Sequence, residues 1–540
     1  MRTSNISSER RYFARLTGAL VLGAVLLAGH TEAWSQKAGG TLTIARPSES
    51  ETLDPHKSSR LITSHVMYLL YDTLVALTPD MKTVVPLLAS SWDVSKDGSV
   101  YTFRLQPNVR FHSGDSLTAD AVKFTFDRWL DPTTKSPSRS FIQGVKSVQV
   151  VDPMTVRVTL SAPNADFLTN LAIGWAGILN PRAVKEAGAD YGTAKVDGTG
   201  PFKFVEWRRS QTLRLERNDD YRWAPSFYKN RGPAHVQTIV FRLVPEDASR
   251  LLEFETGGVN VLYPVPFQEA DRLKKNPKFA VVDYAFGFTI PMFFNLERPV
   301  MKDVRVRRAI AHAINREELA KTVYYGYARA ATGPISDIFP EYWSGIERVE
   351  YEFDPRKAEA LLDEAGWKKG PSGIRMKEGQ PLQITQYLGA GYGFQDLFTI
   401  VQARLRQVGI QMDLKIHEWA TVYGHMGKGE HDGGTRWMIY STPQNMFEQF
   451  YHSSSVPVPN SSMYKNPEVD KLIEALSRLN NANERKATVE RLLRLVMQDL
   501  PTLPLTWQRD VVGFSSSVKG FQPVLGHGAG FYKLMDTWIE

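Results

Sequence analysis

The sequence predicts a protein of the α/β class that contains more than one domain. The chain has 540 residues, which is more than a single hydrophobic core usually serves. Its composition is that of a globular protein, with 42% hydrophobic and 11% aromatic residues. Residues 382–416 have the pattern of a strand, a helix and a second strand. A βαβ unit of this kind requires a partly parallel sheet.

The first strands are predicted by short alternating runs. Residues 40–45 (GTLTIA) indicate a strand that enters the fold. Residues 99–105 alternate apolar and polar side chains directly after an Asp97-Gly98 turn.

The segment that follows adds a helix and another pair of strands. Residues 121–130 predict a helix that stops before Pro132. Residues 148–160 alternate again and are interrupted at Asp152-Pro153. Residues 65–195 therefore read as an α+β unit of their own.

Two helices in the second half have clear start signals. Asp303 is expected to cap one helix, and Asp354 with Pro355 to begin another that Gly366 ends. Their apolar faces are formed by Val306, Ala309, Ile310, Ala313 and Ile314, and by Ala358, Leu361, Leu362 and Ala365.

The βαβ unit itself is marked by periodicity. Residues 382–387 predict a strand, and residues from Gln395 to Gly409 predict an amphipathic helix. Residues 410–416 alternate immediately afterwards. The two strands are therefore expected to be parallel neighbours.

The N-terminal segment has the pattern of an export signal. Arg2, Arg10, Arg11 and Arg15 precede an apolar run, residues 16–28, that is too short to span a bilayer. Small residues near Ala33 and Ser35 predict cleavage there, with residues 1–33 as the signal peptide. The alternative is an N-terminal membrane anchor.

Arg10-Arg11-Tyr12-Phe13 resembles the twin-arginine export pattern, although Glu9 stands where Ser or Thr is usual. An ordinary secretory signal with clustered arginines remains the alternative. The chain has no cysteine, so it can form no disulfide and carry no lipid on a cysteine after the apolar run. We expect a periplasmic protein; an extracellular one remains open.

Charge gives little sign of a polyanionic partner. Removing residues 1–33 takes away four arginines and two glutamates, which lowers the formal net charge from +7 to +5. The sequence contains no Lys/Arg-rich block of the kind that marks nucleic-acid-binding tails. We therefore expect no nucleic-acid partner.

Common catalytic signatures are missing. The sequence has no GxSxG, HExxH, Walker A or GxGxxG arrangement. Residues 425–432 hold two histidines, but their spacing fits no common metal site, and we expect a solvated loop. His56 is expected to have a structural role. We expect no enzyme activity, no cofactor and no resident metal, although paired carboxylates of a hydrolase leave no recognisable motif.

Many short blocks occur in a characteristic order along the chain. They are Glu51-Thr52-Leu53-Asp54-Pro55-His56, residues 69–75, residues 87–92, residues 101–105, residues 109–115, Gly198-Thr199-Gly200-Pro201-Phe202, residues 215–221, residues 303–309 and Asn466-Pro467-Glu468-Val469-Asp470. Together they resemble the extracytoplasmic solute-binding proteins of family 5, the peptide, nickel and opine receptors of ABC transporters. The resemblance covers essentially the whole mature chain.

The resemblance implies a two-lobed periplasmic-binding-protein-like fold (type II, cluster C) with an additional inserted α+β domain. Lobe I would comprise residues 36–64, 196–285 and 500–540, the inserted domain 65–195, and lobe II 286–499. The ligand would bind between the lobes, and hinge closure would bury it.

The resemblance also implies which residues line the site. Trp419, Arg436, Trp437 and Tyr440 would line it from lobe II, with Phe286 and Phe288 from the strand before Asn295. Ser59 and Phe141 are weaker candidates from rough position. For Trp419 the alternative is a core role, and for Arg436 a surface role.

Peptide receptors of this class keep a carboxylate, for the ligand's ammonium, at a position that matches Ile439 or Tyr440. Neither is acidic. A buried ammonium would therefore lack a counter-ion. We expect that free-amine peptides bind poorly and that the ligand has an anionic or strongly polar group near Arg436.

The predicted function is the periplasmic substrate-binding component of an ABC importer. It would capture a small organic solute, either peptide-like, an opine or a related polar compound. Its partners would be the inner-membrane ABC permease with its ATPase subunits, and the protein itself would be a monomer. The alternatives are a nickel-chelate or oligosaccharide receptor of the same fold and, from another class, a secreted hydrolase.

Overall fold

The computed structural model describes residues 38–540 apart from 143, 349, 392 and 526–528. The predicted signal peptide, residues 1–33, and its cleavage site near Ala33 to Ser35 lie outside the described residues. None of the helices in the described part of the chain is both long and apolar enough to cross a membrane.

A single large sheet runs through the described residues. Its strands follow the order β18-β17-β19-β12-β20-β11-β1-β10-β9-β8, and β13 also pairs with β20. The strands are β1 (Thr41–Arg46), β8 (Phe202–Arg208), β9 (Thr212–Arg217), β10 (Thr238–Leu243), β11 (Val261–Leu262), β12 (Phe279–Phe294), β13 (Ala328–Ala330), β17 (Gln383–Gly389), β18 (Gln411–His417), β19 (Gly433–Gly434) and β20 (Thr502–Ser515).

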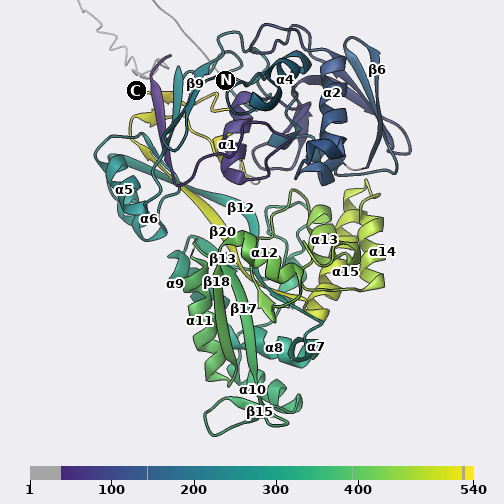
Figure 1. Ribbon diagram of the computed structural model, residues 1–540, viewed down its shortest axis with the longest axis vertical. Helices are drawn as coiled ribbons and strands as arrows, with labels where there is room; N and C mark the ends of the chain where they lie inside the picture. Colours follow the sequence, from purple (N-terminus) through teal and green to yellow (C-terminus); the bar gives the residue numbers. More distant parts are fainter. Residues whose placement is uncertain (1–37, 143, 349, 392, 526–528) are drawn as a thin grey trace, which may run out of the picture. The chain divides into compact units, whose positions relative to one another are not determined.

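Two long strands join the two halves of this sheet (Figure 1). β12 has 16 residues and β20 has 14, and they pair antiparallel from Phe279 opposite Ser515 to Phe293 opposite Thr502. The register shifts between Ala285 and Thr289, where the ladder is interrupted. Such an irregularity locally bends a strand.

The predicted βαβ unit is confirmed. β17 and β18 are parallel, and α11 (Phe394–Gln407) connects them. The predicted caps also form: Asp303 accepts a hydrogen bond from the backbone N–H of Arg305 at the start of α8 (Val304–Ala313). Asp354 does the same for Lys357 at the start of α10 (Pro355–Glu364).

A separate four-stranded sheet lies wholly within residues 65–195. Its order is β4 (Ala89–Val94), β5 (Val100–Leu105), β7 (Thr155–Leu160) and β6 (Val145–Asp152). α2 (Ala119–Leu130) packs on β6 and β7 and buries Phe126 and Trp129. This helix begins two residues earlier than the sequence predicts, because Thr118 precedes it in an extended conformation.

The remaining helices are α1 (Leu61–Leu70), α3 (Phe167–Asn170), α4 (Pro181–Ala187), α5 (Asp247–Glu255), α6 (Phe267–Lys274), α7 (Pro299–Lys302), α9 (Arg316–Tyr324), α12 (Trp419–Gly427), α13 (Pro443–Tyr451), α14 (Pro467–Leu476) and α15 (Ala482–Asp499). The minor strands are β2 (Val75–Leu77), β3 (Val84–Pro86), β14 (Lys368–Lys369), β15 (Arg375–Lys377), β16 (Gln380–Pro381), β21 (Val518–Lys519) and β22 (Trp538–Ile539).

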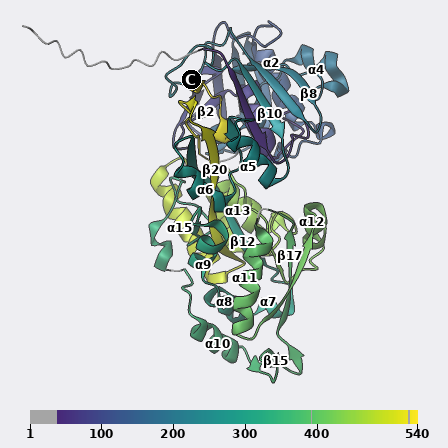
Figure 2. The same cartoon turned by 90° about the vertical axis from the view of Figure 1, so that its left-hand side faces the viewer.

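Buried apolar side chains form distinct clusters on either side of the crossing strands. One cluster draws on residues from Leu42 to Tyr284 and from Val512 to Met535, and two others draw only on residues between Ile290 and Leu505. A small fourth cluster lies where α6 packs beside β20 and α5 packs beside β1 and β11 (Figure 2). The fold thus has separate cores joined by β12 and β20.

Candidate ligand-binding site

An aromatic group lies at the carboxyl ends of β17 and β18. Trp419 begins α12 just after β18 ends, and its ring stacks on Trp437 with centroids 5.5 Å apart. Phe394, the first residue of α11, meets both rings edge-on at 5.3 and 4.8 Å. Open α/β sheets commonly bind ligands beyond the carboxyl ends of their strands, so this position suits a binding surface.

Trp419 is held against the backbone at the end of β17. A Cβ atom at Gly389 would come within 2.2 Å of the Trp419 ring, so only glycine permits this packing. The Trp419 Nε1 is buried and has no hydrogen-bond partner among the described residues. The Trp437 Nε1 donates to Gln508 Oε1 on β20, at 3.2 Å. The aromatic group therefore contacts a crossing strand.

Arg436 packs on a different set of rings. Its guanidinium carbon lies 5.0 Å from the ring centre of Phe450 and 5.7 Å from those of Phe293 and Tyr423. Its Nη2 donates to the carbonyl oxygen of Pro459 at 2.5 Å. Burial lowers the pKa of Arg436. Within the described residues it forms no ion pair, so its predicted role toward an anionic ligand stays a prediction.

Two of the other predicted residues are enclosed by protein. Tyr440 is 1% exposed; its hydroxyl donates to Pro334 O and accepts from Ser336 N, both at 3.1 Å. Phe288 on β12 is 0% exposed. Phe286 also lies on β12, but its side chain is outside the described part of the structure. That Tyr440, Phe288 and Phe286 line the ligand site stays a prediction.

The two weaker candidates, Ser59 and Phe141, have different surroundings. Ser59 is exposed in the loop before α1. Phe141 is partly buried, and its ring stacks on Trp175 at 6.0 Å. Its carbonyl oxygen accepts a hydrogen bond from Asn170 at 3.2 Å. Phe141 also lines a pocket, which Ser59 does not.

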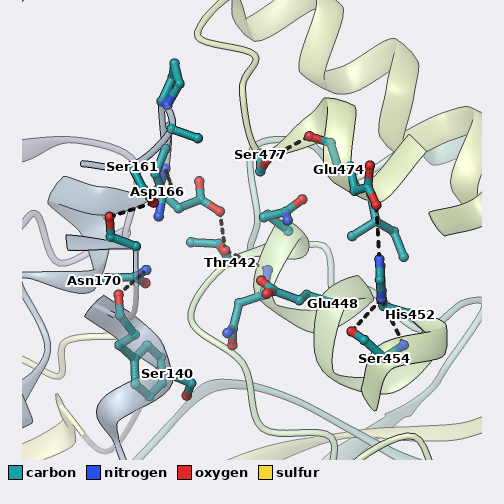
Figure 3. Close-up of a pocket in the computed structure, with 18 residues that line it drawn as sticks. Ser140, Ser161, Asp166, Asn170, Thr442, Glu448, His452, Ser454, Glu474 and Ser477 are labelled. Carbon is teal, nitrogen blue, oxygen red and sulfur yellow. Dashed lines mark hydrogen bonds and ion pairs between the residues drawn. The ribbon is translucent and has the colours of Figure 1, made fainter. Parts of the chain in front are cut away.

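That pocket lies where residues 65–195 meet residues 286–499, and its volume is about 230 Å³ (Figure 3). Half of its lining comes from each segment. One side is formed by Ser140, Phe141, Gly144, Ser161, Ala162, Pro163, Asn164, Asp166 and Asn170, and the other by Thr442, Gln444, Asn445, Glu448, His452, Ser454, Ile473, Glu474 and Ser477.

A buried ion-pair network fastens the two sides of the pocket. Asp166 Oδ1 pairs with Arg485 Nη2 at 2.8 Å, and Asp166 Oδ2 accepts from the Thr442 hydroxyl at 2.5 Å. Arg485 Nε also pairs with Glu341 at 2.9 Å. Burial raises the pKa of Asp166, and Arg485 opposes that rise. Thr442 additionally caps α13 by accepting from the N–H of Asn445.

Further hydrogen bonds cross the same boundary. The Ser441 hydroxyl donates to Asn170 Oδ1 at 3.2 Å, and the backbone N–H of Ala165 donates to Ser477 O at 3.0 Å. Sequence reasoning anticipated only Phe141 among the lining residues. Thr442-Pro443 could have marked the start of α13, because Thr is favoured at the N-cap and Pro at the first position of a helix, but it marks a helix and not a pocket.

The histidine-containing segment is only partly the solvated loop that the sequence suggests. His425 lies on α12 and stacks on Tyr387 at 4.9 Å. His431 is 0% exposed, with Nε2 2.8 Å from Ser461 O, and Asp432 accepts from the N–H of Thr385. The expectation of solvation is therefore wrong for His431 and Asp432, which directly precede β19 and are buried beside the sheet. The described residues hold no group of three or more metal-ligating side chains.

His56 packs as a structural residue. It is 0% exposed and stacks on Trp129 at 5.5 Å. Its Nδ1 lies 2.9 Å from Arg128 Nη1, and the Arg128 guanidinium also pairs with Asp54. The block around Asp54 is thus part of the packing between the first loop and α2.

Known proteins resemble this chain along most of its length. The Glutathione-binding protein GsiB of Pectobacterium atrosepticum is 28% identical over 532 residues, 96% of each chain. The Di/tripeptide-binding protein 2 of Pseudomonas aeruginosa is 29% identical and covers 91% of this chain and 94% of its own.

Solved structures agree with this fold. The periplasmic binding protein DppA of Helicobacter pylori, in complex with the peptide STSA, has a TM-score of 0.79 at 28% identity and covers 93% of this chain and 99% of its own. NikA of Brucella suis, in complex with Fe(III)-EDTA, has a TM-score of 0.82 at 26% identity, with 93% and 100% covered. The predicted two-lobed periplasmic-binding-protein fold is confirmed by these neighbours.

The family match spans the middle of the chain and most of its length. Residues 83–457 match the bacterial extracellular solute-binding proteins, family 5 Middle. This stretch includes Phe141, the aromatic group of Trp419 and Trp437, and most of the pocket lining. The chain belongs to the bacterial extracellular solute-binding proteins of family 5, and it is a substrate-binding component of an ABC importer.

Proposed function

We propose that the mature protein captures a small peptide-like solute between residues 65–195 and residues 286–499 and delivers it to an inner-membrane ABC permease. The observation that carries this proposal is the pocket of Figure 3, whose lining is shared equally by the two segments. A solute in such a position contacts both segments at once and stabilises their closed arrangement.

The names of the relatives support a peptide-like ligand. The two relatives are named for glutathione and for di- and tripeptides, and the DppA neighbour holds a four-residue peptide. Such solutes combine apolar and polar groups. The stacked rings of Trp419 and Trp437 would bury apolar surface, and the polar pocket would orient the charged groups.

Export to the periplasm precedes this function. Cleavage near Ala33 to Ser35 would release a chain that begins close to the first described strand. Mass spectrometry of periplasmic protein would then find a mature N-terminus at residues 34–36. A pool that still begins at Met1 or Arg2 would contradict the proposal.

Binding without reaction is the direct test. Calorimetry and thermal-shift titrations with glutathione, dipeptides, tripeptides and an opine should show saturable binding by at least one of these solutes, with a rise in unfolding temperature. Chromatography of the recovered solute should show it unchanged. Conversion of the solute into products would identify a hydrolase instead. No binding by the peptides, together with binding of a metal chelate or an oligosaccharide, would overturn the peptide-like assignment.

A further inference from the structure

Residues 331–343 connect the crossing strands with the ion pairs beside the pocket, and we call this segment the strap. It follows β13 and forms neither a helix nor a strand. It is nevertheless firmly packed, because Ala331, Ile335, Ser336 and Phe339 are at most 5% exposed. Packed protein interiors transmit strain, so such a segment is suited to carry a displacement from one of its ends to the other.

The first part of the strap is attached to both crossing strands. Trp507 Nε1 on β20 donates to Gly333 O at 3.2 Å, and the Thr289 hydroxyl on β12 donates to Pro334 O at 2.9 Å. Thr289 and Trp507 are opposite each other in the sheet, directly after the interruption of the ladder. This part of the strap therefore follows the position of β12 and β20.

The middle of the strap covers the glycine inside that interruption. A Cβ atom at Gly287 would lie 2.7 Å from Ile338 Cδ1, so the isoleucine side chain rests directly on the backbone of β12. Tyr440 holds this part in place, because its hydroxyl accepts from Ser336 N at 3.1 Å and its ring packs on Phe339 at 5.1 Å. A change in the bend of β12 at Gly287 therefore alters its contact with Ile338.

The last part of the strap reaches the ion pairs that join the two sides of the pocket. Glu341 Oε1 accepts from Arg485 Nε at 2.9 Å, and Nη2 of the same guanidinium binds Asp166 at 2.8 Å. Asp166 belongs to residues 65–195, whereas Glu341 and Arg485 belong to residues 286–499. Because the guanidinium is a rigid fork, the bond to Glu341 sets the direction in which Arg485 offers Nη2 to Asp166.

The aromatic group contacts the same crossing strand. Trp437 Nε1 donates to Gln508 Oε1, and Gln508 is the neighbour of Trp507 on β20. Side chains of consecutive strand residues point to opposite faces of a sheet. This part of β20 thus contacts the aromatic group through Gln508 and the strap through Trp507.

We propose that the strap couples the bend of β12 at Gly287 to the Asp166–Arg485 ion pair, so that the two contacts form and break together. Closure of residues 65–195 on residues 286–499 is then linked, through β20, to the occupancy of the aromatic group. This inference rests on the proposed capture of a solute between the two segments. Glu341 and Ile338 are positioning residues in it, because they act through Arg485 and β12.

The first experiment requires no solute. Because the chain has no cysteine, spin labels can be attached specifically at Lys96→Cys and Lys471→Cys, two exposed positions in residues 65–195 and 286–499. Pulsed electron paramagnetic resonance then measures the distribution of distances between the labels. The variants added to this labelled protein are Glu341→Ala, Ile338→Val, which removes the methyl group over Gly287, and the matched control Glu350→Ala. Glu350 pairs with the buried Arg316 at 2.7 Å, and both belong to residues 286–499.

Glu341→Ala and Ile338→Val should each move the distribution to longer distances, and Glu350→Ala should leave it unchanged. Glu341→Gln retains an acceptor for Arg485 Nε and should restore most of the short distances. Unfolding temperatures verify that each variant is folded. A distribution that does not change in Glu341→Ala or in Ile338→Val, or that shifts equally in the control, would overturn the inference.

The second experiment is a double-mutant cycle between the two ends of the strap. Trp507→Phe removes the donor to Gly333 and keeps an aromatic ring, and Glu341→Ala releases Arg485. Each variant should lower the affinity for trialanine in calorimetry about fivefold, and the double variant should lose no more than either single variant, because one broken end already uncouples the strap.

Losses that multiply to about 25-fold in the double variant would show that the two ends act independently and would overturn the inference. If no protein binds trialanine while the label distances respond as expected, the coupling stands and the peptide assignment fails.

Discussion

At the scale of single residues, Asp510 on β20 gives the structure a defined pH response. Its Oδ2 accepts hydrogen bonds from Tyr263 at 3.0 Å and Tyr284 at 2.8 Å. Burial raises the pKa of Asp510 to about 6, above its ordinary value of 3.8. The stability from this group is therefore fully present below about pH 4 and is lost as the pH rises through about 6.

Asp510→Asn should remove that dependence. Between pH 4.5 and 7.5 the wild type should lose about 2 kcal/mol of unfolding free energy relative to the variant. Urea unfolding at both pH values measures this difference, with the exposed Asp220→Asn as control. If the unfolding free energies of the wild type and Asp510→Asn change in parallel with pH, Asp510 has the same pKa in the folded and unfolded states and the prediction is wrong.

Trp419 is the residue that best separates a ligand wall from a core. It is only partly buried, and its Nε1 lacks a partner. Trp419→Ala should weaken binding of the solute about tenfold or more while lowering the unfolding temperature by only a few degrees. Trp419→Phe should retain the stacking and lose the donor. Severe destabilisation by Trp419→Ala with unchanged affinity would assign the ring to the core.

At the scale of elements, the contacts at the start of α13 hold residues 65–195 against residues 286–499. Asp166→Asn keeps an acceptor for Thr442 but leaves Arg485 with an uncompensated share of its charge. Removing one partner of a buried pair costs about 3–5 kcal/mol. Part of this cost falls on the closed arrangement alone, so solute affinity should fall at least tenfold in calorimetry. The control is Glu468→Gln, which breaks an exposed pair with Arg491. Equal affinities for all proteins would show that the network does not take part in closure.

The sequence predicts best those helices whose ends are marked by a residue that favours the end of a helix. Asp303, Asp354 with Pro355, and Gly409 each mark an end with a residue whose own chemistry sets it. The pocket had no such signal, because Asp166 and Arg485 are 319 residues apart and meet only in the fold. For Tyr440 the sequence gives a position that resembles a ligand position, but not the hydrogen bonds of its hydroxyl to the backbone at Pro334 and Ser336, which arise only in the fold.

At the scale of the whole molecule, the separate cores on either side of β12 and β20 predict a hinge. The ladder is interrupted between Ala285 and Thr289, and Gly287 within it has a φ of +77°. A side chain is strained in that conformation. Saturating solute should therefore reduce the radius of gyration in small-angle scattering. Gly287→Ala should make this decrease in the radius of gyration smaller. A radius that does not change at saturation would indicate a rigid pair of lobes.

The position of β20 in the sheet has a consequence for biosynthesis. This strand lies between β12 and β11, yet it begins only at Thr502. Lys533 likewise supplies the buried counter-ion of Asp72, 461 residues earlier. Until the ribosome has made these segments, the growing chain has unpaired strand edges and an uncompensated acid. The native sheet is therefore incomplete until residues 502–515 have been made.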